Sequence, residues 1–76
     1  MIETIVKFKN RKELFEFAIL ANKCSGDVFL YSGKEIVNMK SPMKACCTDI
    51  TQPLKVEFYG DIPYEVKEGM RKFIVN

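Results

Sequence analysis

The sequence predicts an α+β fold, an open-faced β-sandwich in which three helices cover one face of a four-stranded antiparallel sheet. Apolar and polar residues alternate at residues 2–8 and 54–58, as in half-buried strands. At residues 11–22 and after residue 63, apolar residues recur at helical spacing instead. A glycine turn separates two short apolar stretches between these segments. The predicted element order is β-α-β-β-α-β-α.

Composition is that of an ordinary folded domain. The chain has 76 residues, 47% of them hydrophobic and 29% charged, so we expect a single domain over residues 1–76 and no disordered tract. Lys and Arg number 12 and Asp and Glu number 10, and both signs are spread along the chain, which indicates no nucleic-acid binding. No apolar run is long enough to cross a bilayer and no signal-peptide pattern is present. We therefore expect a cytoplasmic protein that binds no membrane.

The cysteine and histidine content argues against a metal site and against a catalytic nucleophile. Cys24, Cys46 and Cys47 are an odd number and two of them are adjacent, so we expect all three to be reduced packing residues. The chain has no histidine and no obvious set of four zinc ligands, which predicts no metal and no cofactor. No serine or cysteine has a base partner that the sequence can name. We expect a protein that is not an enzyme.

The first strand and the first helix are separated by a change of pattern near residue 10. Asn10 can cap a helix and Glu13 can reach back to form a capping box, so we predict a strand at residues 2–8 and a helix at residues 11–22. Lys12 and Glu16 are expected to form a solvent-facing i,i+4 pair. The apolar stripe that packs on the sheet comprises Leu14, Phe17, Ala18 and Ala21, widened by Phe15 and Leu20.

The rest of the chain predicts a hairpin, a short helix, a strand and a last helix. Strands at residues 28–31 and 35–39 are joined at Gly33. Ser41 and Pro42 are typical of a helix N-cap and first helical position, which predicts a helix at residues 43–49. Residues 54–58 predict a strand with one buried and one solvated face. A last helix begins at Pro63, and its Gly69, at a cost of about 1 kcal/mol relative to alanine, indicates a close contact.

One stretch resembles a known family. Residues 37–43, VNMKSPM, are similar to the VNxKSxM segment of HPr, the family of small phosphocarrier proteins of the bacterial sugar phosphotransferase system. The likeness extends from Ala18 to Asn76 and implies the same open-faced fold. It also implies a regulatory role for Ser41, which corresponds to the serine that a kinase modifies in HPr of many Gram-positive bacteria.

The resemblance does not extend to the phosphocarrier motif. The family carries GxHxRP in the loop after the first strand, where the histidine accepts a phosphoryl group. Here the loop between Phe8 and Leu14 is shorter, and Asn10, Arg11 and Lys12 stand in the place of the motif. An amide cannot form the phosphoramidate that imidazole forms. We therefore predict an HPr-like protein without histidine phosphocarrier activity.

The first functional hypothesis is a regulatory or protein-binding module that acts around Ser41 and the second helix. Ser41 is a phosphorylation candidate, and the helix cap and the phosphorylation switch are compatible, since a phosphate there interacts favourably with the helix dipole. Met43, Cys46 and Cys47 are partner-binding candidates. Pro42 and Cys46 depart from the apolar residues of the family at these positions.

Two alternatives remain. Lys9, Asn10, Arg11 and Lys12 lie at the mouth of the first helix and are candidates for binding an anion or small ligand. A structural dimerisation module is the other alternative, with an interface on the uncovered sheet face. The candidates for that interface are Ile5, Phe29, Tyr31 and Tyr59. We expect a protein partner and either a monomer or a weak homodimer.

Overall fold

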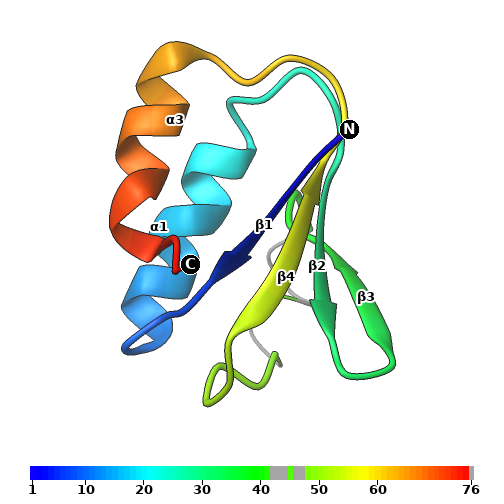
Figure 1. Ribbon diagram of the computed structural model, residues 1–76, viewed down its shortest axis with the longest axis vertical. Coiled ribbons are helices and arrows are strands. Elements are labelled where there is room, and N and C mark those ends of the chain that lie inside the picture. Colours follow the sequence, from blue (N-terminus) through cyan, green and yellow to red (C-terminus); the bar gives the residue numbers. More distant parts are fainter. Residues whose placement is uncertain (42–44, 46–47, 76) are drawn as a thin grey trace.

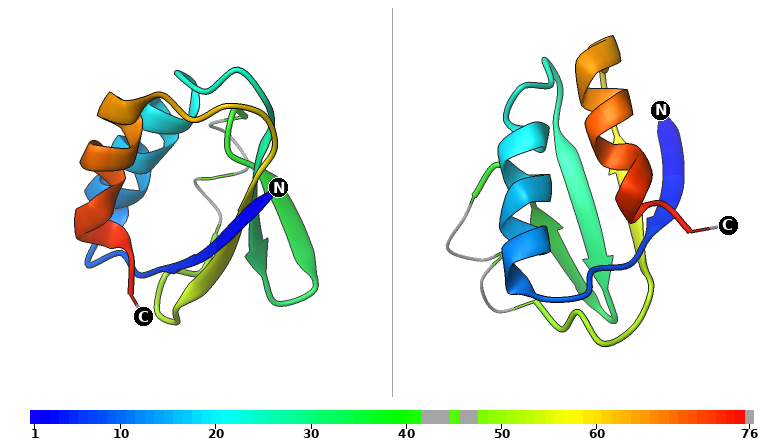
Figure 2. Two further views of the ribbon diagram at one scale, coloured as in Figure 1. Left: turned by 45° about the horizontal axis from the view of Figure 1, so that its top comes forward. Right: turned by 90° about the vertical axis from the view of Figure 1, so that its left-hand side faces the viewer.

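The computed structural model describes residues 1–41, 45 and 48–75, and it confirms an α+β fold built on a four-stranded antiparallel sheet (Figure 1). The strand order is β1-β4-β2-β3. Helices α1 and α3 lie side by side on one face of this sheet (Figure 2). The strands are β1 (Ile2–Val6), β2 (Val28–Ser32), β3 (Glu35–Asn38) and β4 (Leu54–Phe58), and the helices are α1 (Arg11–Ala21) and α3 (Tyr64–Met70) with a 3-10 helix, η1 (Arg71–Phe73), after it.

Three helices were predicted, and the part of the chain that the structure describes contains two α-helices and η1. The helix predicted at residues 43–49 lies outside the described residues except for Ala45, Thr48 and Asp49. Ala45 is helical and its N–H donates to the carbonyl of Ser41 at 3.4 Å. Asp49 is not helical, so the predicted end of this helix is too late. No helix in the described ranges is long and apolar enough to cross a membrane.

The first strand and the last helix are both shorter than predicted. β1 ends at Val6 and not at residue 8, because its pairing with β4 stops at Val6 opposite Leu54. The backbone around Val6 also pairs with the C-terminal segment. The Lys7 N–H donates to the Phe73 carbonyl at 2.8 Å, and the Val75 N–H donates to the Ile5 carbonyl at 2.9 Å. The last helix therefore gives way to η1 and then to extended backbone beside β1.

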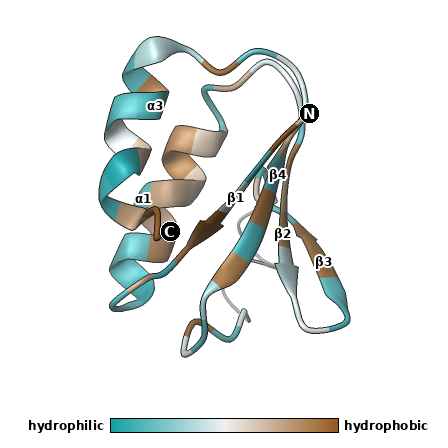
Figure 3. Ribbon diagram, in the orientation of Figure 1, coloured by the Kyte–Doolittle hydropathy of each residue, from teal (hydrophilic) through white to brown (hydrophobic). Residues whose placement is uncertain are grey.

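The core lies between the sheet and the two helices. Phe17 of α1 is at its centre, with ring centroids 5.4 Å from Phe8, 5.9 Å from Phe73 and 6.4 Å from Phe58. Apolar colouring covers much of β1 and the C-terminal half of α1, whereas most of α3 is hydrophilic (Figure 3). Phe15 was predicted to widen the stripe of α1, but it is 39% exposed. It is one residue from Leu14, and a helix turns by about 100° per residue, so Phe15 points away from the core.

The two helices approach each other closely at Gly69, as predicted. A Cβ at Gly69 would lie 3.1 Å from both methyl carbons of Leu20 on α1. The same contact region contains an ion pair in which Lys72 Nζ lies 2.7 Å from Glu16 Oε2. The expected Lys12–Glu16 pair is therefore wrong, because Glu16 faces α3 and its partner is Lys72. The hydrogen bond from Lys72 lowers the pKa of Glu16.

Two loops cross where Gly26 meets Gly60. A Cβ at Gly26 would lie 1.5 Å from the carbonyl oxygen of Tyr59, and one at Gly60 would lie 3.0 Å from the Gly26 Cα. Gly60 also has a φ of 90°, a conformation that side chains rarely adopt. The connection from α1 to β2 thus lies directly against the connection from β4 to α3 (Figure 1).

Candidate protein-interaction site

Ser41 lies in a tight turn that follows β3. The Asn38 side-chain oxygen accepts the Lys40 N–H at 2.9 Å, and the Asn38 carbonyl accepts the Ser41 N–H at 2.9 Å. Ser41 is half-buried, and its own carbonyl accepts the Ala45 N–H, as the carbonyl of an N-cap residue does. The turn therefore fixes the backbone of the candidate serine shortly after the end of β3, and its carbonyl bonds to the helical Ala45.

A lysine ties this turn to the C-terminal end of α1. Lys40 Nζ donates to the carbonyl of Cys24 at 2.8 Å. Cys24 is a free, buried cysteine, and burial raises the pKa of its thiol despite the nearby charge of Lys40. Cys24 is thus a neutral packing residue. The candidates Met43, Cys46 and Cys47, and Pro42 beside them, lie outside the described residues, and partner binding by them stays a prediction.

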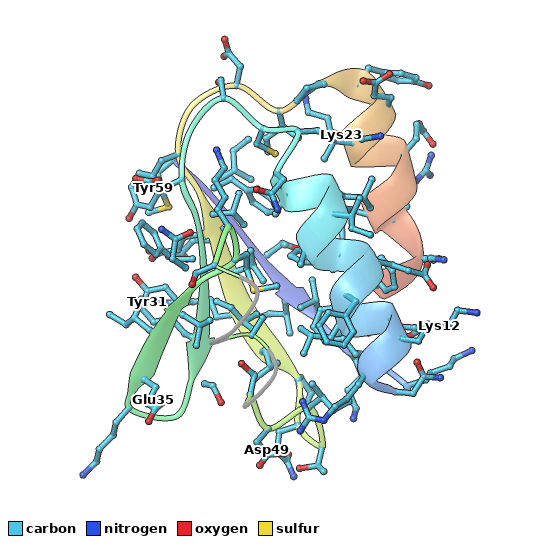
Figure 4. The ribbon with its side chains drawn as sticks, turned by 180° about the vertical axis from the view of Figure 1, so that it is seen from behind. Lys12, Lys23, Tyr31, Glu35, Asp49 and Tyr59 are labelled. Atoms are coloured by element: carbon cyan, nitrogen blue, oxygen red, sulfur yellow. The ribbon has the colours of Figure 1, made fainter. Side chains whose placement is uncertain are left out.

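The N-terminal end of α1 has the predicted cap by Asn10, while Glu13 reaches back to the residue before the N-cap and not to the N-cap itself. The Asn10 side chain accepts the Glu13 N–H at 3.0 Å, and Glu13 Oε1 accepts the Lys9 N–H at 2.8 Å. Lys9, Arg11 and Lys12 are exposed, and Figure 4 shows Lys12 at this end of the helix. The carboxylate of Glu13 already occupies the helix end to which an anion was predicted to bind. Anion binding by these residues stays a prediction.

The loop before β4 is tied to the end of β1. Lys7 Nζ donates to the carbonyls of Ile50 and Thr51 at 3.2 and 2.9 Å. Asp49 Oδ1 accepts the hydroxyl and the N–H of Thr51 at 2.7 and 2.9 Å. These hydrogen bonds from Thr51, together with the charges of Arg11 and Lys7, hold the pKa of Asp49 below its ordinary value. The groups described near Arg11 and Lys7 therefore include a hydrogen-bonded carboxylate, that of Asp49.

The four residues predicted on the uncovered sheet face share that face. Ile5 is 39% exposed and Tyr59 is 40% exposed. The rings of Phe29 and Tyr59 pack edge to face with their centroids 5.7 Å apart. Tyr31 and Tyr59 lie on the side of the sheet away from α1 (Figure 4). Their use as an interface stays a prediction.

Glu57 is the residue on this face that sequence reasoning missed. The alternation of β4 predicted it on the solvated face, but it is only 7% exposed. Tyr31 and Tyr59 both donate their hydroxyls to Glu57 Oε1, at 2.5 and 2.9 Å. These bonds lower the pKa of Glu57, raise the pKa of Tyr31 to about 12 and raise that of Tyr59. Only the adjacency of β2 and β4 brings Tyr31 beside Glu57, and no local pattern reveals it.

Lys55 extends this arrangement into a network across three strands. Its Nζ lies 3.6 Å from Glu57 and 3.9 Å from Glu3 on β1. It also lies 4.3 Å from the ring centroid of Tyr31, in cation–π geometry. The centre of the face is therefore a satisfied polar network, and the face is less apolar than the sequence predicted. Within the described ranges, no group of three or more His, Cys, Asp or Glu could hold a metal ion.

Topology and site together define an α+β open-faced sandwich whose candidate site is a serine turn in a chain without histidine. The chain is similar to the crystal structure of HPr-C-His from Thermoanaerobacter tengcongensis, with a TM-score of 0.72 and 24% sequence identity over 95% of this chain and 89% of that one. The fold is therefore that of HPr. No protein-family model matches the sequence, and no curated protein matches it.

Proposed function

We propose that this chain is a regulatory, protein-binding module with the HPr fold, which acts in the cytoplasm through the surface around Ser41. It works without histidine phosphocarrier chemistry, because the 76 residues contain no imidazole to form a phosphoramidate. The observation that carries the proposal is the position of Ser41 in an HPr fold: it is half-buried in a turn after β3, and its carbonyl accepts the Ala45 N–H.

The chemistry of this position suits a phosphorylation switch. A phosphoserine adds about −1.5 to −2 charges and accepts strong hydrogen bonds, and a helix N-terminus supplies free N–H groups and a favourable dipole. One modification there changes both the charge of the surface and the hydrogen bonds of the cap. An unmodified serine at this position can therefore cap the helix, and a phosphorylated serine can alter partner binding.

The outer face of α1 carries exposed apolar side chains. Phe15 and Ile19 lie one turn apart on this helix, and both are exposed. The bond from Lys40 to the Cys24 carbonyl ties the serine turn to the end of α1. This bond supports a fixed position of the serine turn relative to the end of α1. The free, buried Cys24 supports the reducing cytoplasm as the location.

Binding and modification of Ser41 variants test the proposal. Immobilised wild-type protein captures a partner, and the Kd is then measured with Ser41→Ala and Ser41→Asp. We expect Ser41→Ala to bind as the wild type does and Ser41→Asp to change the Kd about tenfold. Incubation with a serine kinase and ATP should modify the wild type at Ser41 and leave Ser41→Ala unmodified, as mapped by mass spectrometry.

Ser32→Asp is the matched control, because it adds the same charge at the end of β2. It should leave partner binding unchanged. If Ser32→Asp changes the Kd and Ser41→Asp does not, the partner surface lies elsewhere. A kinase that modifies Ser41→Ala as fast as the wild type contradicts the phosphorylation switch.

A further inference from the structure

We propose that the uncovered face of the sheet binds an arginine side chain of a partner protein. The guanidinium pairs with the carboxylate of Glu3 and stacks on the ring of Tyr59, and apolar residues beside the arginine cover the exposed isoleucines of this face. These contacts involve side chains that stand on the face and no backbone group at the edge of the sheet. The face does not include the serine turn, so this binding does not depend on the function proposed above.

Two carboxylates stand directly opposite each other on this face. Glu3 of β1 is the register partner of Glu57 of β4, and like charges in such positions repel each other. Lys55 Nζ lies 3.6 Å from the carboxylate of Glu57 and 3.9 Å from that of Glu3. Among the described residues, Lys55 is the only cation within ion-pair distance of either carboxylate. Two negative charges thus share one positive charge, and the network has a net negative charge.

Glu3 is the carboxylate that an incoming cation can reach. Glu57 is 7% exposed, and its Oε1 accepts the hydroxyls of Tyr31 and Tyr59. The side chain of Glu3 is 48% exposed. Its distance of 3.9 Å from Lys55 is long, because a charge-assisted N–H···O bond is about 2.7–2.9 Å. A guanidinium can therefore approach Glu3 more closely than Lys55 does.

The aromatic rings of this face can hold a cation. Lys55 Nζ already lies 4.3 Å from the ring centroid of Tyr31. Tyr59 is 40% exposed, and in the described ranges no cation lies over its ring. Tyr59 is two residues beyond Glu57, which makes it a diagonal neighbour of Glu3, about 7–8 Å away. A guanidinium over the ring of Tyr59 is therefore within reach of the Glu3 carboxylate.

Charge and shape select the occupant. A two-fold dimer places the same surface of both copies against each other, so the carboxylates of one face would meet those of the other. A cationic partner complements this face instead. Arginine suits it better than lysine, because a planar guanidinium both stacks on an aromatic ring and forms two parallel hydrogen bonds to a carboxylate.

Apolar surface flanks the charged centre and favours a protein segment over a free cation. Ile5 and Ile36 are 39% and 57% exposed and stand at the two ends of one row of residues across the four strands. Figure 4 shows Tyr31 and Tyr59 on the same side of the sheet, away from α1. Apolar side chains on both sides of the arginine can therefore cover the isoleucines while the guanidinium lies between them.

Amide spectra of the ¹⁵N-labelled chain test the proposal with a blocked five-residue peptide that has arginine at its centre and leucine at both ends. The matched control peptide has citrulline in place of arginine, which keeps the shape and removes the charge. We expect chemical-shift changes at Glu3, Lys55 and Tyr59 with the arginine peptide. The citrulline peptide should bind about tenfold more weakly, because it loses the charge-assisted hydrogen bonds to Glu3.

Charge removal in the chain provides an independent arm. Glu3→Gln should weaken binding of the arginine peptide about tenfold. Glu35→Gln is the matched control, because it removes the same charge at an exposed position that lies off this face, opposite Ser32, and it should leave the Kd unchanged. Lys55→Gln should tighten binding, because both carboxylates then lack their cation, whereas Lys34→Gln at the exposed hairpin turn should not.

Three results would overturn the proposal. Equal binding of the arginine and citrulline peptides would show that only the apolar residues are recognised. Shift changes confined to α1 or to the serine turn would place the peptide elsewhere. Light scattering that shows a dimer of the wild type, with shift changes on dilution at Glu3 and Tyr59, would assign the face to a second copy of the chain.

Discussion

At the scale of single residues, Glu57 shows how a charged side chain is held on an open sheet face. Its carboxylate accepts two tyrosine hydroxyls and lies 3.6 Å from Lys55 Nζ. A carboxylate with little exposure must be paired and hydrogen-bonded to remain charged. The hydroxyls of Tyr31 and Tyr59 therefore hold Glu57 in its ionised form. A partner that docks on this face meets polar groups that already have hydrogen-bond partners.

The first prediction concerns the pH dependence of stability. The pKa of Glu57 in the folded protein lies below the ordinary value of 4.5. Its ionised form therefore stabilises the fold above that value, and this contribution is lost as the pH falls through the folded-state pKa. The free energy of unfolding should fall less from neutral to acid pH in Glu57→Gln than in the wild type. Urea denaturation at both pH values measures the difference.

Tyr31→Phe is the companion variant for this measurement. It removes the hydrogen bond that most lowers the pKa of Glu57 but keeps the ring and the carboxylate. Its loss of stability in acid should lie between those of the wild type and Glu57→Gln. Equal losses of stability in all three proteins would show that the ionisation of Glu57 does not contribute to the pH dependence of folding.

At the scale of elements, the cap by Asn10 defines where α1 begins. We expect Asn10→Ala to lower the free energy of unfolding by about 1 kcal/mol, because the Glu13 N–H then loses its acceptor. Lys12→Ala, an exposed change on the same turn, should have little effect. Thermal or urea unfolding followed by circular dichroism measures both. Equal stability of the two variants would indicate that water replaces the cap without loss.

The crossing of two loops gives the next prediction. Gly26→Ala places a Cβ into the Tyr59 carbonyl and should cost about 3 kcal/mol, since backbone must move. Gly33→Ala is the control, because a Cβ at Gly33 has open space and only its φ of 60° is unfavourable, at about 1 kcal/mol. Denaturation midpoints of the two variants separate crowding from backbone conformation. A larger loss at Gly33 would contradict the close crossing.

At the scale of the whole molecule, stability depends on the aromatic cluster around Phe17. A chain of this size has a free energy of unfolding of only about 4–11 kcal/mol. Phe17→Ala, which removes the central ring, should cost about 3–5 kcal/mol, which leaves much of the protein unfolded if its stability is at the lower end of the range for a chain of this size. Phe15→Ala on the same helix should change stability by about 0.5 kcal/mol or less. Amide dispersion in NMR spectra distinguishes the two outcomes.

The sequence predicted the elements that have a local pattern. The strand at residues 54–58 and the start of α1 at Arg11 were predicted correctly, because alternation and the helix cap are properties of neighbouring residues. The strand order could not be predicted in this way. Nothing near β4 indicates that β1 and β2 flank it, and the burial of Glu57 follows from that order. The solvated position predicted for Glu57 was wrong for this reason.

The candidate site was predicted in part for similar reasons. Ser41 was identified as a helix cap from the proline after it and as a regulatory candidate from the resemblance of residues 37–43 to HPr. The bond from Lys40 that ties its turn to α1 depends on tertiary packing. The sequence assigned Glu13 to helix capping. It assigned anion binding to the basic residues Lys9, Arg11 and Lys12. In the folded protein both roles require the same helix end, and Glu13 occupies it. Sequence patterns describe each role without showing such competition.

The pairing of β1 with β4 also bears on how the chain acquires its shape during synthesis. Ile2 and Phe58 are partners in the sheet, so β1 has no neighbouring strand until β4 has left the exit tunnel of the ribosome. The hairpin of β2 and β3 is the only strand pair in the described ranges that closes locally. Nascent chains that stop before residue 54 should therefore remain unfolded, and the domain should form late and in a single cooperative event.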